Sequence, residues 1–415
     1  MRVLTCAFVL LSALSAPAAA KDLPEPYASK SVKNFSHVIG WKEGETPLAP
    51  SGFTVSKLAS GFHNPRWLCQ APNGDILVAE SNSKHSTAER TLAPLVGADK
   101  SNNLDDSADR ISVIKPDGQV ATYLDHGLNQ PFGMLFLNGY FYVANTDALL
   151  RFRLVEGKLP KDAKAEKLLA LPAGKKSRHW TRSLLAKPDG SKLYIGVGSS
   201  SNVGENGLDK EVRRACILEV DPDGANAQVL ASGLRNPVGL DFEPATGALW
   251  CVVNERDELG DELVPDYLTR VQDGGYYGWP FSYWGEHRDP RRKETPPKQK
   301  VLLPDVDLGS HVSALGLAFY TAKRFPPHYR GGAFVGEHGS WNRKDLAGYK
   351  VVYVPFQDGQ PSGPPEDFLA GFQVKGDDPK AVHGRPVGLL QTKDGSLLLA
   401  DDTGNTVWKI SAEGR

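Results

Sequence analysis

The sequence predicts an all-β fold, a six-bladed β-propeller of four-stranded antiparallel blades, and three observations lead to it. One loose pattern occurs six times: a Pro- or Gly-containing start, an apolar strand, a turn and a second apolar strand. The 415 residues include 42 glycines and 30 prolines, which suits many short strands joined by tight turns. Long amphipathic helical patterns are scarce. Four-stranded units that repeat in this way can close into a ring, in which each blade buries its faces against its neighbours.

The six repeats account for most of the expected strands. They are HNPRWLCQAPNGDILVAES (63–81), NQPFGMLFLNGYFYVANT (129–146), HWTRSLLAKPDGSKLYIGVG (179–198), RNPVGLDFEPATGALWCVVNE (235–255), SALGLAFY with GGAFVGEH (313–320 and 331–338) and GRPVGLLQTKDGSLLLADD (384–402). Further strands lie between them, such as RISVIKPDGQVATYL (110–124) and RACILEVDPDGANAQVLA (214–231). The alternative is a pair of β-sandwiches, and the shared PxG…PDG…L-x-V pattern argues against it.

The first twenty residues have the composition of a secretory signal peptide. Arg2 gives a basic start, an apolar run follows, and Ala18-Ala19-Ala20 forms a small-residue cleavage site. We expect cleavage after Ala20 and a soluble exported protein in the periplasm; the alternative is an uncleaved anchor. Residues 21–50 then form a polar lead-in, and residues 51–415 form the propeller. No later segment is long and apolar enough for a membrane span.

Charge and cysteine content exclude some classes of function. The formal net charge of −1 gives no broad field that would draw the protein to nucleic acid or to anionic lipid. Cys69, Cys216 and Cys251 remain after cleavage, and an odd number cannot all pair internally. Each lies in or near an apolar strand, so we expect buried thiols and a core that is stable without a disulfide framework.

Two long polar segments interrupt the repeats, at 82–108 and 282–311. Loops of this length in a compact domain tend to be functional or mobile. In a propeller we expect both on one face, around the central channel.

His179 begins the third repeat, where the others have Pro or Gly. The innermost strand of each blade runs along the central channel, so residues at its start surround the channel mouth. A histidine there can accept a proton near neutral pH. The alternative is a histidine whose ring is satisfied by backbone at a strand end.

Two further repeats begin with cationic or amide side chains. Arg235 and Asn236 begin the fourth repeat, and Arg385 lies at the start of the sixth. A guanidinium beside an amide can bind carboxylates or carbonyls of a ligand. The alternative is ordinary surface charge, but the repeats place these positions together at the centre of the ring.

An acidic loop, NERDELGDELVPDYLTRVQDGGYYGWP (254–280), follows the fourth repeat. Carboxylates and exposed carbonyls on an irregular loop suit calcium, although the spacing is not that of an EF-hand. A solvated acidic loop is the alternative.

Several of these segments together resemble one enzyme family. HWTRSLLAKPDGSKLY resembles the H-x-G-x-x-L-x-F-x-P-D-G-x-L-Y segment of the glucose/sorbosone dehydrogenases, and GLRNPVGLDF and GDEL…YYGWP resemble two more of that family's motifs. HGSWNR (338–343), with GYKVV after it, resembles the sorbosone dehydrogenase branch. The resemblance covers roughly residues 50 to 412. It implies a soluble six-bladed propeller enzyme that uses pyrroloquinoline quinone (PQQ) and calcium.

The resemblance also implies roles for the cofactor and substrate residues. His179 matches the general base that removes the sugar hydroxyl proton as hydride moves to the quinone. Arg235 and Asn236 match the pair that faces the quinone oxygens, and Arg385 matches the first arginine of an R-x-R pair that holds a PQQ carboxylate. Gln130 falls where the family's glutamine touches substrate. In this family PQQ would pass its electrons to a respiratory acceptor, a quinone or a cytochrome.

The metal ligands come from the same resemblance. The backbone carbonyls of Arg256 and Asp257 fall where the family's Gly-Pro holds calcium against PQQ. Glu262 and Tyr277 match ligands of a second calcium.

The sequence departs from the family pattern at four places. Arg256-Asp257 replaces Gly-Pro, Val387 replaces the second arginine of R-x-R, and Thr181 replaces the glycine after the base. The family's cofactor lysine has no clear counterpart, and His338 or Arg343 of HGSWNR is the candidate substitute.

The function that these observations predict is PQQ- and calcium-dependent oxidation of a sugar, either an aldose or a sugar aldehyde such as sorbosone. One alternative is a calcium-dependent propeller lactonase or related hydrolase, which would bind metal through side chains at the channel centre. The other is a non-catalytic propeller that binds a glycan or a protein.

Overall fold

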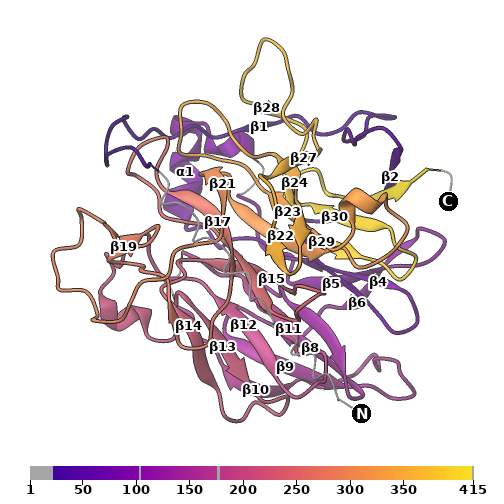
Figure 1. The fold of residues 1–415 in the computed structure, drawn as a ribbon. Coiled ribbons are helices and arrows are strands. Elements are labelled where there is room, and N and C mark those ends of the chain that lie inside the picture. The colour runs from indigo at the N-terminus through magenta and orange to yellow at the C-terminus, as the bar shows by residue number, and fades with distance from the viewer. Residues whose placement is uncertain (1–21, 102–103, 175–177, 414–415) are drawn as a thin grey trace, which may run out of the picture.

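Six four-stranded antiparallel sheets make up most of the computed structural model, which describes residues 22–101, 104–174 and 178–413. The sheets are arranged as blades around a common axis (Figure 1), so the predicted six-bladed propeller is confirmed. The expected signal peptide, residues 1–20, lies outside the described residues. In the part of the chain that the structure describes, no helix combines the length and apolar character needed to cross a bilayer.

The first three blades follow the chain in order from their innermost strand outward. Blade one contains β3 (Pro65–Gln70), β4 (Ile76–Glu80), β5 (Arg110–Ile114) and β6 (Val120–Leu124). Blade two contains β7 (Met134–Leu137), β8 (Tyr140–Ala144), β9 (Ala148–Arg153) and β10 (Glu166–Ala170). Blade three contains β11 (Arg182–Ala186), β12 (Leu193–Val197), β13 (Cys216–Val220) and β14 (Gln228–Ser232), and the short β18 (Gly275–Tyr276) pairs with β14.

The last three blades complete the ring. Blade four contains β15 (Pro237–Phe242), β16 (Leu249–Val253), β17 (Pro265–Arg270) and β21 (Val306–Ser310). Blade five contains β22 (Ala314–Phe319), β23 (Ala333–Glu337), β24 (Lys350–Val354) and β27 (Glu366–Leu369). Blade six contains β29 (Pro386–Gln391), β30 (Leu397–Asp401), β31 (Thr406–Ala412) and β2 (Phe53–Ser60).

The glycine of the repeated PxG pattern lies where inner strands approach each other most closely. A Cβ added to Gly239 would lie 2.6 Å from the Cβ of Leu317 on the next inner strand. A Cβ added to Gly388 would lie 2.5 Å from the Arg66 carbonyl oxygen. Real Cβ atoms do not approach so closely, so the narrow centre of the ring excludes a side chain at these positions.

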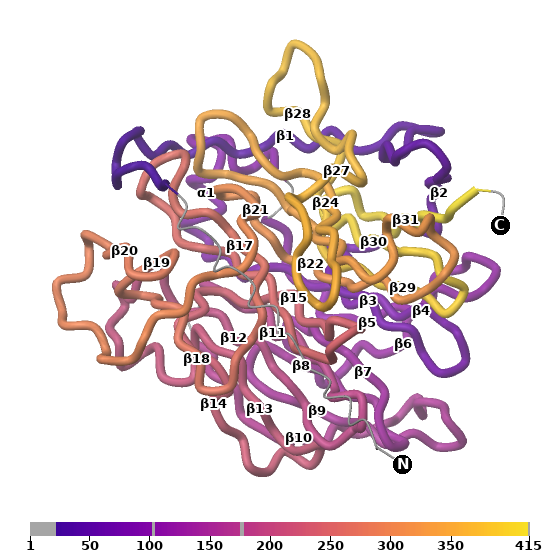
Figure 2. The backbone as a smooth tube through the Cα atoms, in the orientation of Figure 1, coloured from indigo at the N-terminus to yellow at the C-terminus, as the bar shows by residue number. Residues whose placement is uncertain are grey.

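The ring closes by pairing strands from opposite ends of the chain. Strand β2 lies antiparallel to β31, with Phe53 opposite Ala412 and Ser60 opposite Thr406 (Figure 2). Blade six therefore takes its outermost strand from the beginning of the propeller segment. This arrangement leaves no open end between the first and last blades.

The lead-in that precedes β2 crosses one end of the propeller. Its strand β1 (His37–Val38) pairs in parallel with β28 (Ala381–Val382), and both lie along the edge of the molecule in Figure 1. Trp41 packs against Trp408 and donates a 2.7 Å hydrogen bond to Asp401. The lead-in is therefore attached to blade six as well as to the loops above it.

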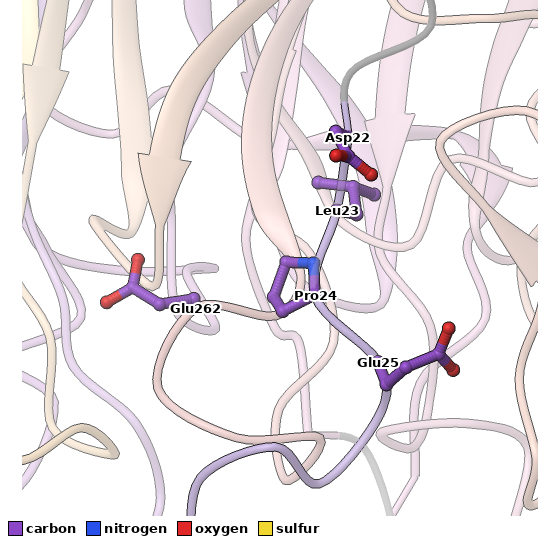
Figure 3. Close-up of a pocket in the computed structure, with 5 residues that line it drawn as sticks. All are labelled: Asp22, Leu23, Pro24, Glu25 and Glu262. Carbon is purple, nitrogen blue, oxygen red and sulfur yellow. The ribbon is translucent and has the colours of Figure 1, made fainter.

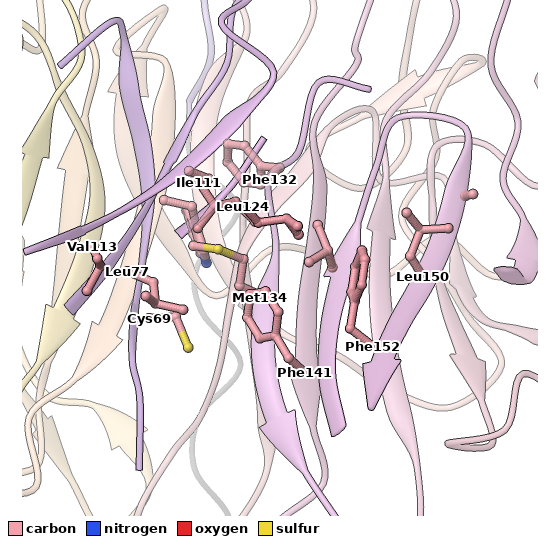
Figure 4. Packing of buried hydrophobic residues seen from close by; sticks show 14 of the residues in the cluster. Cys69, Leu77, Ile111, Val113, Leu124, Phe132, Met134, Phe141, Leu150 and Phe152 are labelled. Atoms are coloured by element: carbon pink, nitrogen blue, oxygen red, sulfur yellow. The ribbon is translucent and has the colours of Figure 1, made fainter. Parts of the chain in front are cut away.

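The core is divided among the interfaces between blades. In one cluster Met134 and Phe141 of blade two pack beside Cys69 and Leu77 of blade one (Figure 4). The predicted thiols Cys69, Cys216 and Cys251 are all unpaired and buried, as expected. The core thus forms without a disulfide.

Both long insertions contain short elements. Residues 82–108 include helix α1 (Thr87–Val96), which begins with a capping box between Ser86 and Glu89, and the 3₁₀ helix η1 (Ala98–Ser101). The second insertion contains the hairpin of β19 (Ser282–Tyr283) and β20 (His287–Arg288). The remaining short elements are η2 (Leu208–Glu211), η3 (Pro327–Tyr329), β25 (Phe356–Gln357) and β26 (Gln360–Pro361).

Candidate active site

A cavity of about 220 Å³ lies at the end of the propeller where the inner strands begin. Inner and second strands are antiparallel, so the starts of the former and the ends of the latter meet at this end. Guanidinium, imidazole, indole, amide and carboxylate groups line it, and these belong to Arg66, Arg178, Arg235, His179, His338, Trp180, Trp341, Asn236, Asn254 and Asp257. The cavity is therefore polar, cationic and flanked by two indoles.

His179 lies in this cavity, three residues before β11 begins. Its Nδ1 lies 3.0 Å from both the carbonyl oxygen and the hydroxyl of Ser199, which follows β12. A carbonyl oxygen can only accept a hydrogen bond, so Nδ1 carries the proton in this contact. In the neutral ring Nε2 is then the basic nitrogen.

The surroundings of His179 keep its ring neutral. Burial lowers its pKa well below the ordinary value, and the charges of Arg235 and Arg178 lower it further. A neutral imidazole that lies beside cations is a proton acceptor at physiological pH. Binding of a polyanion among the same cations would offset their effect and raise the basicity of this ring.

Gly198 allows His179 and Asn236 to approach each other. A Cβ at position 198 would lie 2.2 Å from the Asn236 Oδ1 and 2.5 Å from the Cβ of His179. The Oδ1 of Asn236 is buried and has no hydrogen-bond partner among the described residues. A buried polar atom without a partner is what a polar ligand would satisfy.

Asp257 holds two of the cavity guanidinium groups in place. Its Oδ2 accepts hydrogen bonds from Arg235 at 3.1 Å and Arg178 at 3.0 Å, and its Oδ1 accepts one from Asn342 at 2.7 Å. Burial alone would raise the pKa of Asp257, but Arg235 and Arg178 lower it below its ordinary value. Asp257 is therefore ionised, and the two guanidinium groups are fixed in orientation.

A second carboxylate, Asp402, organises the opposite wall. Its Oδ2 accepts hydrogen bonds from Arg66 and from His338, the latter at 2.8 Å. The Nε of Arg66 is buried and has no partner among the described residues. Burial and the charge of Arg385 lower the pKa of His338 to about 4, so His338 is neutral and donates to Asp402.

Arg385 lies behind His338. Its Nε donates to the His338 carbonyl oxygen at 3.0 Å and its Nη2 to that of Gly339 at 2.7 Å. The guanidinium also lies over the ring of Tyr349. The structure thus brings His179, Arg235, Asn236 and His338 to one cavity, with Arg385 one layer further away.

Gln130 lies in the wall of a larger adjoining cavity of about 1120 Å³. Ser83, Arg178 and Trp180 line both cavities, so the two are neighbours. The Nε2 of Gln130 donates to the Asn82 carbonyl oxygen at 2.7 Å. The first insertion forms part of the same wall and so reaches the site, as expected.

Arg256 and Asp257, the expected calcium-binding backbone, belong to an ion-pair network. The Asp257 carbonyl oxygen accepts hydrogen bonds from Asn202 at 3.1 Å and Arg291 at 2.8 Å. The Arg256 side chain is fully buried and pairs with Glu255 and Asp289. Among the described residues, no group of three His, Cys, Asp or Glu side chains could hold a metal ion.

The other two expected ligands, Glu262 and Tyr277, have different partners. Glu262 is exposed, borders the chain at Asp22–Glu25 (Figure 3) and accepts a 2.8 Å hydrogen bond from Arg343. Arg343 consequently lies outside the cavity that contains His179. The buried Tyr277 hydroxyl donates to the Arg270 carbonyl oxygen at 2.5 Å.

Sequence reasoning missed Arg66, Arg178 and Trp341. Arg66 follows Asn64-Pro65 in the first repeat, whereas Arg235 precedes Asn236-Pro237 in the fourth, so the two arginines do not align and the repeat does not identify Arg66. Arg178 directly precedes the histidine, and its guanidinium lies over the Trp341 ring at 5.7 Å. Trp341 also stacks on Phe35 of the lead-in, a contact that nothing in the local sequence indicates.

The chain matches the family model for "Glucose / Sorbosone dehydrogenase" over residues 137–351, which is more than half of its length. It belongs to the glucose/sorbosone dehydrogenase family. The matched region includes His179, Arg235, Asp257 and His338.

One sequence relative spans most of this family member. An uncharacterised protein of Borreliella burgdorferi is 28% identical over 297 residues, which is 69% of this chain and 76% of the relative.

Two solved structures are similar in fold. The calcium structure of a Trichoderma reesei enzyme of carbohydrate-active family AA12 has a TM-score of 0.69 at 18% identity and covers 88% of this chain and 97% of its own. The holo form of the pyranose dehydrogenase PQQ domain from Coprinopsis cinerea has a TM-score of 0.67 at 18% identity and covers 91% and 100%. At these identities the likeness establishes the fold.

Proposed function

We propose that this protein is a PQQ-dependent sugar dehydrogenase that oxidises an aldose or a sugar aldehyde such as sorbosone, with His179 as the general base. We place it in the periplasm, where a respiratory quinone or cytochrome would accept the electrons. The observation that carries the proposal is the meeting of a neutral His179 with the guanidinium groups of Arg66, Arg178 and Arg235 around one cavity.

The cavity residues fit PQQ, which is flat and carries three carboxylates. The three guanidinium groups of the cavity pair with two carboxylates, Asp257 and Asp402, so one positive charge is in excess and a polyanion is attracted. Among the described residues the buried Arg66 Nε lacks a partner and can donate to a carboxylate of such a ligand, whereas the partnerless Asn236 Oδ1 can accept only from an N–H or O–H group of a ligand. Trp180 and Trp341 add aromatic surface to the cavity lining, with Arg66 over the Trp180 ring and Arg178 over the Trp341 ring.

His179 and its neighbouring side chains have separate roles in the oxidation of a hydroxyl group. When bound, PQQ supplies the quinone that accepts the hydride. The Nε2 of His179 takes the hydroxyl proton, while the Ser199 contact at Nδ1 fixes the ring. Arg235 stabilises negative charge that develops beside it, because Asp257 and Asn202 hold its guanidinium in position.

The residues expected to hold calcium do not fit that role. The Asp257 carbonyl already accepts two hydrogen bonds, and four guanidinium groups surround the loop. No step of the proposed oxidation therefore involves a calcium ion.

The test is reconstitution of the purified protein with PQQ, followed by dye reduction with a panel of aldoses, sorbosone and simple aldehydes. We expect PQQ to bind and at least one sugar to be oxidised. His179→Gln should lower kcat by about 10²–10⁴-fold and leave PQQ affinity nearly unchanged, since Gln cannot accept the proton.

His126→Gln is the matched control, because His126 is half exposed and contacts Asp125 and the Ala163 carbonyl away from the cavity. It should retain full activity. Lactone hydrolysis without PQQ would favour the hydrolase alternative and reject the proposal. Equal losses of kcat and PQQ affinity in His179→Gln would contradict a general-base role.

A further inference from the structure

We propose that this chain has replaced the family's calcium beside the cofactor by arginine side chains, so that its cofactor site works without a divalent cation. The part that concerns the cofactor rests on the proposed function. The absence of a calcium site is independent of it. The hydrogen bonds and ion pairs of the loop of residues 254–262 support this inference.

The Asp257 carbonyl oxygen has no capacity left for a metal ion. A backbone carbonyl has two lone pairs. Asn202 Nδ2 occupies one at 3.1 Å and Arg291 Nη1 the other at 2.8 Å. Calcium needs six to eight oxygen ligands, so binding here would have to break both hydrogen bonds.

Arg256 stands where the family has glycine, and it places a buried cation at this position. Its guanidinium donates to Glu255 at 2.9 Å, to Asp289 at 3.2 Å and to the carbonyl oxygens of Pro280 and Ser282 at 3.0 and 2.7 Å. A guanidinium stays protonated at physiological pH, so this buried charge is permanent.

Three carboxylates of this network, Glu255, Asp257 and Asp289, already face a cation. Glu255 pairs with Arg256, Asp289 with Arg256 and Arg291, and Asp257 with Arg178 and Arg235. Four guanidinium groups thus face three carboxylates. A divalent cation would meet net repulsion, whereas a ligand carboxylate would meet attraction.

The second insertion supplies the key side chain. Arg291 follows the β19–β20 hairpin and is fixed by two hydrogen bonds to Asp289, at 2.9 and 2.8 Å. The Arg291 guanidinium also donates a hydrogen bond to the Asp257 carbonyl oxygen. The insertion therefore brings a guanidinium to the loop at which the resemblance expects calcium.

The first experiment is titration of the metal-stripped wild-type protein with Ca²⁺ by isothermal calorimetry and by thermal unfolding. We expect no binding heat and no rise in Tm, because a cation that binds the native state would raise Tm. In parallel, PQQ affinity is measured by tryptophan fluorescence in excess chelator and in millimolar Ca²⁺. We expect the two affinities to agree. Stoichiometric Ca²⁺ binding, or PQQ affinity that improves about tenfold or more with Ca²⁺, would overturn the proposal.

The two proposals can fail separately. Absence of PQQ binding in both buffers would reject the proposed function, while the Ca²⁺ titration still decides the present one. PQQ binding that requires Ca²⁺ would support the function and reject the present inference.

A variant tests the role of Arg291 directly. Arg291→Ala frees one lone pair of the Asp257 carbonyl and leaves Asp289 with one cation fewer, so the variant should gain a Ca²⁺-dependent rise in Tm. Arg288→Ala is the matched control, since Arg288 is exposed in the same hairpin and its side chain donates to the Glu294 carbonyl. It should show no such rise. A rise in the wild type, or none in Arg291→Ala, would contradict the assignment.

Discussion

Asp402→Asn tests how strongly the cavity wall depends on one buried carboxylate. Asp402 is 1% exposed and accepts hydrogen bonds from both Arg66 and His338. An asparagine of the same size can still accept from one of them, but it cannot balance the charge of Arg66. The Arg66 guanidinium, whose side chain is only 10% exposed, would be left as an unpaired buried cation.

Removing one partner of a buried ion pair typically costs about 3–5 kcal/mol. The entropy of unfolding at the midpoint is about 0.8 kcal/mol/K for a chain of this length, from about 2 cal/mol/K per residue. A loss of about 4 kcal/mol therefore lowers Tm by about 5 °C. His338 should contribute little to this loss, because it is neutral and can keep its hydrogen bond to Asn.

The assay is urea unfolding followed by fluorescence, with calorimetry for Tm. Asp367→Asn is the control: Asp367 is 66% exposed and pairs with Lys350, so its loss should cost at most about 1 kcal/mol. Under the proposed function, PQQ would bring carboxylates to Arg66 and should raise the Tm of Asp402→Asn more than that of the wild type. A loss below about 1 kcal/mol for Asp402→Asn would refute the view that Asp402 holds Arg66.

Three further predictions concern the surroundings of the site. Gly198→Ala places a methyl against His179, and it should lower kcat at least about tenfold while destabilising the fold by about 1–3 kcal/mol, as measured by steady-state kinetics and urea unfolding. Phe35→Ala removes the ring stacked at 5.6 Å on Trp341, and it should weaken PQQ binding by a factor of about 2–12 in a fluorescence titration, with kcat retained. Burial raises the pKa of Glu337 to about 8, so the folded state keeps a proton that an unfolded carboxyl loses near pH 4.5. The stability that this group contributes is therefore lost as the pH rises toward 8. Glu337→Gln should consequently unfold at a higher urea concentration than the wild type at pH 9, but not at pH 5.

The repeats predicted the fold because they reflect the geometry of the ring. The PxG glycines lie where inner strands leave no space for a Cβ, and alternating residues such as Leu193, Ile195 and Val197 fill the interfaces between blades. The same repeats placed His179 and Arg235 at one cavity, because the starts of inner strands converge.

The rest of the site depends on contacts between segments far apart in the sequence. Arg291 reaches Asp257 from an insertion, and Trp341 takes its position from Phe35 of the lead-in. Periodicity carries no information about such contacts. A resemblance between motifs assigns a role to the Asp257 carbonyl, but it cannot reveal which donors the lone pairs of this oxygen accept.

The pairing of β2 with β31 sets the order in which a functional molecule can be completed. Thr406–Ala412 is synthesised more than 350 residues after the strand Phe53–Ser60 that it must join. Asp402, which holds Arg66 and His338, lies just before that last strand. A chain that ended before β31 would still contain the strands of the first five blades, but β2 would lack its partner and Asp402 would lie at a frayed end instead of inside a closed ring.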